Sequence, residues 1–136
     1  DIRNGLDFLT VTLPSGRKLY YVKPFLANND FDKEAIHYWG MDQTTKKWSK
    51  MSTYGGKLVE NVVQAIARDC LAETLIRLEK AGYQTVMHIH DEVVLDVPEV
   101  FAELEVITDL MGQPISWAPG LQLKAEGFVT SYYMKD

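Results

Sequence analysis

The hydrophobic positions change their period along the chain, and the first part has the two-residue period of β-strands. Residues 8–13 and 18–23 alternate apolar and polar side chains on either side of a Pro-Ser-Gly-Arg turn, which predicts a β-hairpin. Residues 24–33 are predicted to form a loop. A third β-like run covers 34–41, and a polar turn, DQTTKK, and a short segment around Trp48 follow it.

A long amphipathic helix is predicted from Lys57 to about Lys80, with Gly82 ending it. Its apolar positions recur every three or four residues: Leu58, Val59, Val62, Val63, Ile66, Cys70, Leu71, Leu75 and Leu78. A polar stripe with the same spacing lies opposite: Lys57, Glu60 or Asn61, Gln64 and Arg68. We therefore expect Ile66 and Cys70 to be buried, and Glu60, Gln64 and Arg68 to be exposed.

The last third predicts a second hairpin, a second helix and a final strand. Two runs rich in β-branched residues, 85–89 and 93–97, meet at His90-Asp91-Glu92. Residues 99–111 are amphipathic, with acidic residues in the first turns, and predict a helix. A strand is predicted near 121–129. This order of elements indicates an α+β fold, in which helices pack against an antiparallel sheet.

Length and composition fit one globular domain, because 136 residues with 46% apolar side chains are enough to form a core. We expect a single domain over 1–136, with a β-rich lead-in at 1–54 and the long helix, second hairpin, second helix and last strand at 55–136. The sequence contains no signal-peptide pattern and no apolar run long enough for a membrane helix. The first residue is not Met, so the chain is compatible with a fragment of a longer protein.

Charge and cysteine content narrow the function further. The net charge of −5 does not favour a self-sufficient DNA-binding protein, which usually has a basic face for the phosphates. An acidic balance suits a catalytic core that gathers divalent cations. Cys70 is the one cysteine, so no internal disulfide forms; we expect it to be a small core residue in a reducing compartment.

The candidate chemistry lies at the second hairpin, in His88-Ile89-His90-Asp91-Glu92. Alternation along a strand places His88 and His90 on one face. Asp91 and Glu92 fall where a turn breaks the alternation, so both carboxylates can approach one edge. Adjacent carboxylates between apolar strands repel each other unless a cation lies between them, and oxygen ligands favour Mg²⁺. The alternative is a charged turn exposed to solvent.

The same residues resemble a known family. HDE between two β-runs, after a long helix with Gln64 in its middle, is similar to motif C of the DNA polymerase I-like (family A) DNA polymerases. The stretch from YGGKLVENVVQAIARD to HIHDEVVLDVP resembles the bacteriophage and prophage form of these enzymes. The resemblance covers about residues 50–136 and extends less securely to the leading hairpin. It implies the C-terminal part of a polymerase palm subdomain.

The resemblance implies a role for each residue of the turn. Asp91 matches the motif C metal ligand, and Glu92 matches the second acid of the motif. Family catalysis is phosphoryl transfer between two Mg²⁺ ions, which adds dNTPs to a primer 3′-end. His90 matches a residue beside the primer terminus, whereas His88 is interpreted as structural or peripheral.

The helix is implied to contact DNA. Gln64 matches a residue that reaches the new base pair from the minor groove, where every Watson–Crick pair presents acceptors. Asn61 and Arg68 lie one turn away and are expected to assist as DNA-binding residues. The family places Asn four residues before the Gln, but this chain has Glu60 there and Asn61 at three.

Two parts of the family pattern are absent from these 136 residues: the Asp of motif A and the Arg and Lys of the fingers helix. We therefore expect the chain alone to be inactive and to need the upstream part of the same polymerase. Primer-template DNA and dNTPs are the expected partners of the complete enzyme. No membrane partner is expected, and the resemblance implies a location in the cytoplasm of a bacterium or of a phage-infected host.

Two other functions fit the residues less well. A metal hydrolase would use His88, His90 and Asp91, because catalytic zinc sites take three protein ligands and a water; His37 is the remaining histidine available to it. A stand-alone, non-catalytic nucleic-acid-binding module would keep the hairpin without the reaction.

Overall fold

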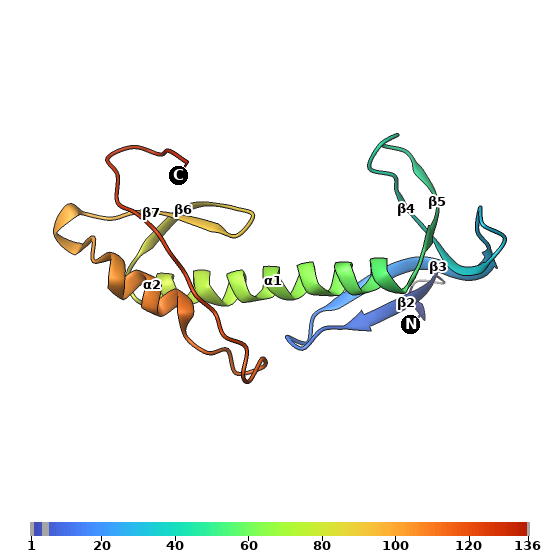
Figure 1. Cartoon of the computed structure of the whole chain (residues 1–136), viewed down its shortest axis with the longest axis horizontal. Helices are drawn as coiled ribbons and strands as arrows, with labels where there is room; N and C mark the ends of the chain where they lie inside the picture. Colours follow the sequence, from blue (N-terminus) through green and yellow to red (C-terminus); the bar gives the residue numbers. More distant parts are fainter. Residues whose placement is uncertain (1, 4–5, 136) are drawn as a thin grey trace. The chain divides into compact units, whose positions relative to one another are not determined.

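The computed structural model describes residues 2–3 and 6–135 and divides the chain into two compact units (Figure 1). Unit 1 comprises residues 1–65 and unit 2 comprises residues 66–136. Helix α1 (Gly55–Lys80) begins in the first and ends in the second. The expected single domain, with its division after residue 54, stays a prediction.

Unit 1 is built on a five-stranded antiparallel sheet in which the strands pair in chain order. Its strands are β1 (Ile2–Arg3), β2 (Leu6–Thr12), β3 (Lys18–Asn28), β4 (Glu34–Met41) and β5 (Trp48–Thr53). The predicted first hairpin is confirmed, because β2 and β3 pair from Phe8↔Val22 to Thr12↔Lys18. The predicted third run is confirmed as β4, and the segment around Trp48 forms β5.

The loop predicted at 24–33 is wrong over its first half. Strand β3 continues to Asn28, and a bulge accommodates the proline that argued against a strand. Val22 pairs with Trp39 and Phe25 with His37, so Lys23 and Pro24 together lie opposite one residue of β4. The true turn is shorter, and the Asn29 side-chain oxygen accepts hydrogen bonds from the backbone N–H groups of Phe31 and Lys33.

The turn predicted at 42–47 is confirmed, and one side chain organises it. The Asp42 carboxylate accepts hydrogen bonds from the backbone N–H groups of Thr44 and Thr45, both at 2.8 Å. These bonds favour the ionised carboxylate and lower the pKa of Asp42.

The long helix is confirmed, and α1 begins two residues before the predicted start. Its end is a Schellman motif, in which Tyr83 N–H donates to the Leu78 carbonyl and Gly82 N–H donates to that of Glu79. Gly82 has φ of +88°, a conformation that glycine adopts without a Cβ penalty. Arg77 and Lys80 in the last turn place positive charge at the negative end of the helix dipole.

The buried face of α1 differs from the predicted stripe in its first half. Val59 and Val63 are 62% and 60% exposed, which contradicts their expected burial. The inward positions of this half are Leu58, Asn61, Val62 and Ala65. The polar Asn61 takes an inward position because its amide donates to the Tyr21 hydroxyl at 3.0 Å, which satisfies both groups.

In the second half of α1 the expectations hold better. Cys70, Leu71 and Leu78 are buried, whereas Ile66 is only half-buried. Burial raises the pKa of the Cys70 thiol, as expected for a core cysteine. Two polar residues, Asp69 and Thr74, are also buried on this face, and the apolar pattern did not indicate them.

Unit 2 contains the second predicted hairpin, which is confirmed. Strands β6 (Gln84–Ile89) and β7 (Glu92–Asp96) pair antiparallel as a two-stranded sheet. A short 3₁₀ turn (η1, Glu99–Phe101) and helix α2 (Leu104–Gly112) follow. With antiparallel sheets and two α-helices, the α+β fold class is confirmed.

The second helix was predicted to cover 99–111, and its first turn is wrong. The chain leaves the helical conformation at Ala102, where ψ is +56°. Val100 and Phe101 are largely exposed, so this turn has little apolar packing to support a regular helix. Helix α2 therefore begins at Leu104.

The strand predicted near 121–129 is also wrong, because these residues form no regular strand. They run back past α2, as Figure 1 shows. A Cβ added to Gly112 would lie 3.2 Å from the Leu123 carbonyl oxygen, and one added to Gly127 would lie 3.2 Å from the Leu104 side chain. The backbone of this segment thus lies against α2 at Leu123 and Gly127 instead of pairing with a strand.

Unit 2 is anchored by side chains of α1. The Arg77 guanidinium donates to the carbonyls of Gln113 at 2.8 Å, Pro114 at 2.7 Å and Leu110 at 3.4 Å. It therefore satisfies carbonyls at the C-terminal end of α2 that have no partner within the helix. The Trp117 indole N–H donates to Glu73 of α1 at 3.1 Å.

Among the described residues, no helix is long and apolar enough to span a membrane.

Candidate functional site

The β6–β7 hairpin places the candidate carboxylates at its tip. Ile89 pairs with Glu92, so His90 and Asp91 form a two-residue turn. His90 has φ of +54°, and Asp91 is not among the residues with positive φ. Positive φ at the first turn position alone is the φ pattern of a type II′ turn, where glycine is normal. A histidine in this conformation costs about 1–2 kcal/mol.

The three side chains of the tip are open to solvent. His90, Asp91 and Glu92 are all exposed. The Lys135 ammonium lies 3.6 Å from a Glu92 carboxylate oxygen, with side chains 62% and 44% exposed. A surface pair of this kind contributes about 0–1 kcal/mol, so Glu92 is not firmly held. The sequence pattern did not indicate Lys135.

Within unit 2, the predicted DNA-binding residue Arg68 of α1 contacts His88 of β6. An Arg68 Nη1 lies 3.2 Å from His88 Nδ1, so the guanidinium donates and the imidazole nitrogen accepts. This contact gives His88 a definite partner and agrees with a supporting role. Because His90 leaves the extended conformation, the alternation that relates it to His88 ends at Ile89.

The residues of the polar stripe in unit 1 differ in their exposure and in their hydrogen-bond partners. Gln64 is exposed, and its amide donates to Glu60 at 3.2 Å, while Lys57 pairs with the other Glu60 oxygen at 3.0 Å. Asn61, by contrast, is half-buried and donates to Tyr21. The exposure expected for Glu60, Gln64 and Arg68 is confirmed.

The donor chemistry of the hairpin tip suits a hard cation. Mg²⁺ is commonly bound by one or two carboxylates together with waters and substrate phosphates. Asp91 and Glu92 supply two adjacent carboxylates of this kind, and solvent reaches both. The part of the chain that the structure describes contains no group of three or more His, Cys, Asp or Glu side chains arranged for a metal. The tip therefore fits a partial, open site.

The remaining histidine considered for a hydrolase lies in unit 1. The His37 ring is buried, stacks on Phe25 with 5.2 Å between ring centroids, and has Nδ1 3.1 Å from the Ala35 carbonyl. These contacts are those of a packed core residue.

The sequence is similar to that of the DNA polymerase of Bacillus phage SP02, with 57% identity over 142 residues. The similarity covers 99% of this chain and 22% of that polymerase, so the chain spans less than a quarter of the length of this relative. No protein-family profile matches the chain, and no solved structure matches it.

Proposed function

We propose that this chain is the C-terminal palm segment of a family A, phage-type DNA polymerase, which extends a primer 3′-end with dNTPs by phosphoryl transfer. The observation that carries the proposal is the β6–β7 tip. A strained two-residue turn presents Asp91 and Glu92 to solvent, in a chain 57% identical to a phage DNA polymerase. Strained backbone of this kind is often retained at functional sites.

Asp91 is the proposed metal ligand, and Glu92 is the second acid. When bound, Mg²⁺ would neutralise charge on the nucleotide phosphates and activate the primer hydroxyl. The turn places Asp91 at the tip of the hairpin, where it is exposed to solvent. The weak Lys135 contact leaves the Glu92 carboxylate able to turn toward a cation.

Other residues would position the DNA. The exposed His90 imidazole can hold a primer phosphate or sugar next to the Asp91 carboxylate. Gln64 can donate its amide to minor-groove acceptors, once it releases Glu60. Arg68 is expected to help on the same helix, with His88 steadying its guanidinium. For Asn61, the bond to Tyr21 suggests a supporting contribution to this helix face.

The reaction needs groups that these 136 residues do not supply. The motif A carboxylate and the fingers cations belong to the upstream part of the proposed polymerase. Two carboxylates from one turn leave most Mg²⁺ ligands to water, and no fingers side chain meets the triphosphate. The isolated chain should therefore show no templated nucleotide incorporation.

The proposal is tested by Asp91→Ala in a complete polymerase that carries this chain. Incorporation should fall by about 10³-fold or more, because catalysis of this type depends on electrostatic stabilisation of the transferring phosphoryl group. Primer-template binding should change less than threefold. The measurements are single-turnover primer extension and a DNA-binding titration.

Asp96→Ala is the matched control, since Asp96 is an exposed carboxylate at the other end of β7 and should be dispensable. Full incorporation by the Asp91→Ala enzyme would refute the catalytic role and favour a non-catalytic binding module. Templated incorporation by the isolated chain would also contradict the proposal.

A further inference from the structure

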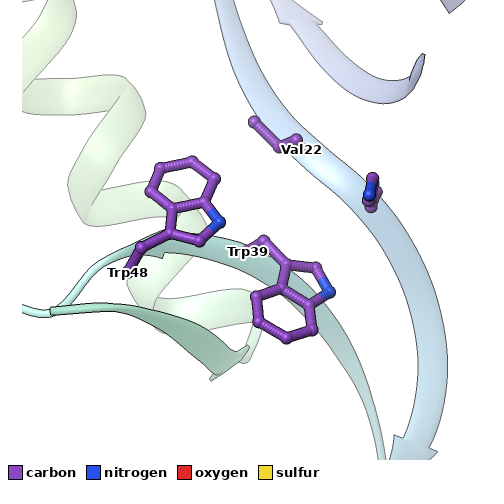
Figure 2. A pocket seen from close by; sticks show the side chains of 4 residues that line it. Val22, Trp39 and Trp48 are labelled. Carbon is purple, nitrogen blue, oxygen red and sulfur yellow. The ribbon is translucent and has the colours of Figure 1, made fainter. Parts of the chain in front are cut away.

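Unit 1 has a surface hollow that no part of the proposed reaction uses. It has a volume of about 350 Å³ and is lined by Val22, Lys23, Trp39 and Trp48 (Figure 2). Trp48 is 57% exposed and Trp39 is half-buried. Two indoles at the surface of a small unit leave a large apolar area in contact with water, which marks a binding surface.

The strand register places this hollow on the outer face of the sheet. Val22 pairs with Trp39, Trp39 with Lys50, and Trp48 with Met41, so these side chains share one face. The opposite face carries Tyr21 and Tyr38, which meet edge to edge at 5.0 Å; Tyr21 also bonds to Asn61 of α1. The tryptophans therefore lie on the side away from the helix contact.

The spacing of the indoles suits two neighbouring flat ligands. Because Trp39 pairs with Lys50, Trp48 is its diagonal neighbour on β5, and such residues have Cα atoms about 7–8 Å apart. Figure 2 shows the two indole groups on adjacent strands at the edge of the hollow, with Val22 on the neighbouring strand. Successive bases of an unstacked strand can each meet one indole.

The β-bulge places a cation in the same hollow. Lys23 lies in the bulge with φ of +48°, directly before a proline, where left-handed backbone is unfavourable. Bulges of this kind commonly re-aim a side chain beside a functional site. Lys50 adds a second ammonium on the indole face, through its pairing with Trp39.

The charge of unit 1 supports an anionic ligand. Residues 1–65 hold nine Lys and Arg against seven Asp and Glu, a net charge of +2. Residues 66–136 hold five against twelve, a net charge of −7. The acidity of the whole chain thus conceals a basic unit, and Lys46 and Lys47 stand in the turn directly before Trp48.

We propose that this face, formed by Trp39, Trp48, Lys23 and Lys50, binds single-stranded nucleic acid, with bases stacked on the indoles and phosphates on the lysines. Aromatic platforms beside cations bind single strands with little sequence preference. The choice of DNA over RNA rests on the proposed polymerase function. The role of this face is to hold an unpaired strand.

The test titrates the 136-residue chain against fluorescein-labelled oligo-dT of about 15 nucleotides, a length within the usual site size of such platforms. Binding is measured by anisotropy, in EDTA and without dNTPs, so that the result does not depend on the metal site. Full incorporation by the complete polymerase with Asp91→Ala, together with normal oligo-dT binding by the chain, would refute only the proposed function. Loss of incorporation in that Asp91→Ala polymerase, together with no oligo-dT binding by the wild-type chain, would refute only this inference.

The expected results separate stacking from charge. Trp39→Ala and Trp48→Ala should each weaken binding about tenfold. Trp39→Phe and Trp48→Phe, which keep a ring, should weaken it less, while Trp117→Phe should have no effect. Lys23→Ala and Lys50→Ala should each reduce the slope of log K against log salt by about 0.7. Lys80→Ala, in unit 2, should leave that slope unchanged.

Three outcomes would overturn the inference. These are no binding of oligo-dT by the wild-type chain, equal binding by the Trp→Ala variants with unchanged circular dichroism, and equal competition by duplex DNA of the same length. The last would indicate a general attraction for polyanions rather than a stacking site.

Discussion

The contacts that stabilise the interior of unit 1 differ from those that stabilise the interior of unit 2. Unit 1 depends on a continuous five-stranded sheet. Two hydrogen bonds join its part of α1 to the strands and their turn. The Asn61 amide donates to the Tyr21 hydroxyl at 3.0 Å, and the Arg17 guanidinium donates to the Ala65 carbonyl at 3.1 Å. Unit 2 has only a two-stranded sheet, and side chains of α1 hold its other segments. The fold of unit 2 therefore depends on hydrogen bonds from a few side chains rather than on an extended network of backbone hydrogen bonds.

The net charge also differs between the two units. The basic residues are concentrated in unit 1, which carries the exposed indoles, and the acidic residues in unit 2, which carries the candidate catalytic turn. Net charge averaged over the chain argued against nucleic-acid binding. The distribution between the units fits the two proposals made above, which place strand binding in unit 1 and cation binding in unit 2.

The largest effect is expected from Leu78→Ala in unit 2. Leu78 is fully buried, and its truncation should cost about 2–5 kcal/mol in the free energy of unfolding. Denaturant unfolding is followed by tryptophan fluorescence. One background keeps only Trp117 and reports on unit 2, and the other keeps only Trp39 and Trp48 and reports on unit 1. We expect the Trp117 transition to move more.

Val100→Ala, at a largely exposed position of unit 2, is the control for Leu78→Ala and should move neither transition appreciably. Equal shifts of both transitions in Leu78→Ala would show that the chain unfolds as one cooperative domain. The distinction between the units would then be geometric only.

A smaller effect is expected from Arg77→Ala. It removes the donor for three carbonyls at the end of α2 and in the following loop, and should cost unit 2 about 1–3 kcal/mol. Arg77→Lys should recover part of this loss, since lysine cannot reproduce the planar fork. Arg68→Ala, which removes an exposed arginine of the same helix, should cost less than about 0.5 kcal/mol. If Arg77→Ala were equally silent, the anchoring of unit 2 would lie elsewhere.

The smallest effect is expected in unit 1, from Tyr21→Phe. Removing the hydroxyl leaves the Asn61 amide without its partner, and should cost about 1 kcal/mol in the Trp39 and Trp48 transition. Tyr54→Phe, at a largely exposed ring, is the matched control. A loss as large as that of Arg77→Ala would mean that unit 1 depends on its helix contact as strongly as unit 2 does.

Local patterns predicted most of the elements, and the errors lie where tertiary contacts decide the structure. Alternation and turn residues were enough for the two hairpins, and periodicity was enough for α1. They were not enough for 121–129, where the backbone at Leu123 and Gly127 lies against α2 instead of pairing with a strand. Periodicity also could not indicate that Asn61 would take an inward position while Val59 and Val63 stay exposed, because the partner of Asn61 is Tyr21, forty residues away.

The candidate site was predictable in its residues but not in its geometry. The sequence indicated Asp91 and Glu92 because they are adjacent carboxylates between two predicted strands. The hairpin places both at an exposed tip. The positive φ of His90, the Arg68–His88 contact and the approach of Lys135 could not be predicted. Each depends on backbone conformation or on residues distant in the sequence.

The bulge at Lys23 and Pro24 also restricts how the sheet can assemble. A strand of eleven residues between two partners could slide by one position, and every side chain would then change face. Proline cannot donate to a ladder, so a shifted pairing that places Pro24 at a bonding position loses a backbone hydrogen bond. Misaligned folding intermediates are therefore penalised, and the same two residues that aim an ammonium into the hollow keep the chain from settling in the wrong register.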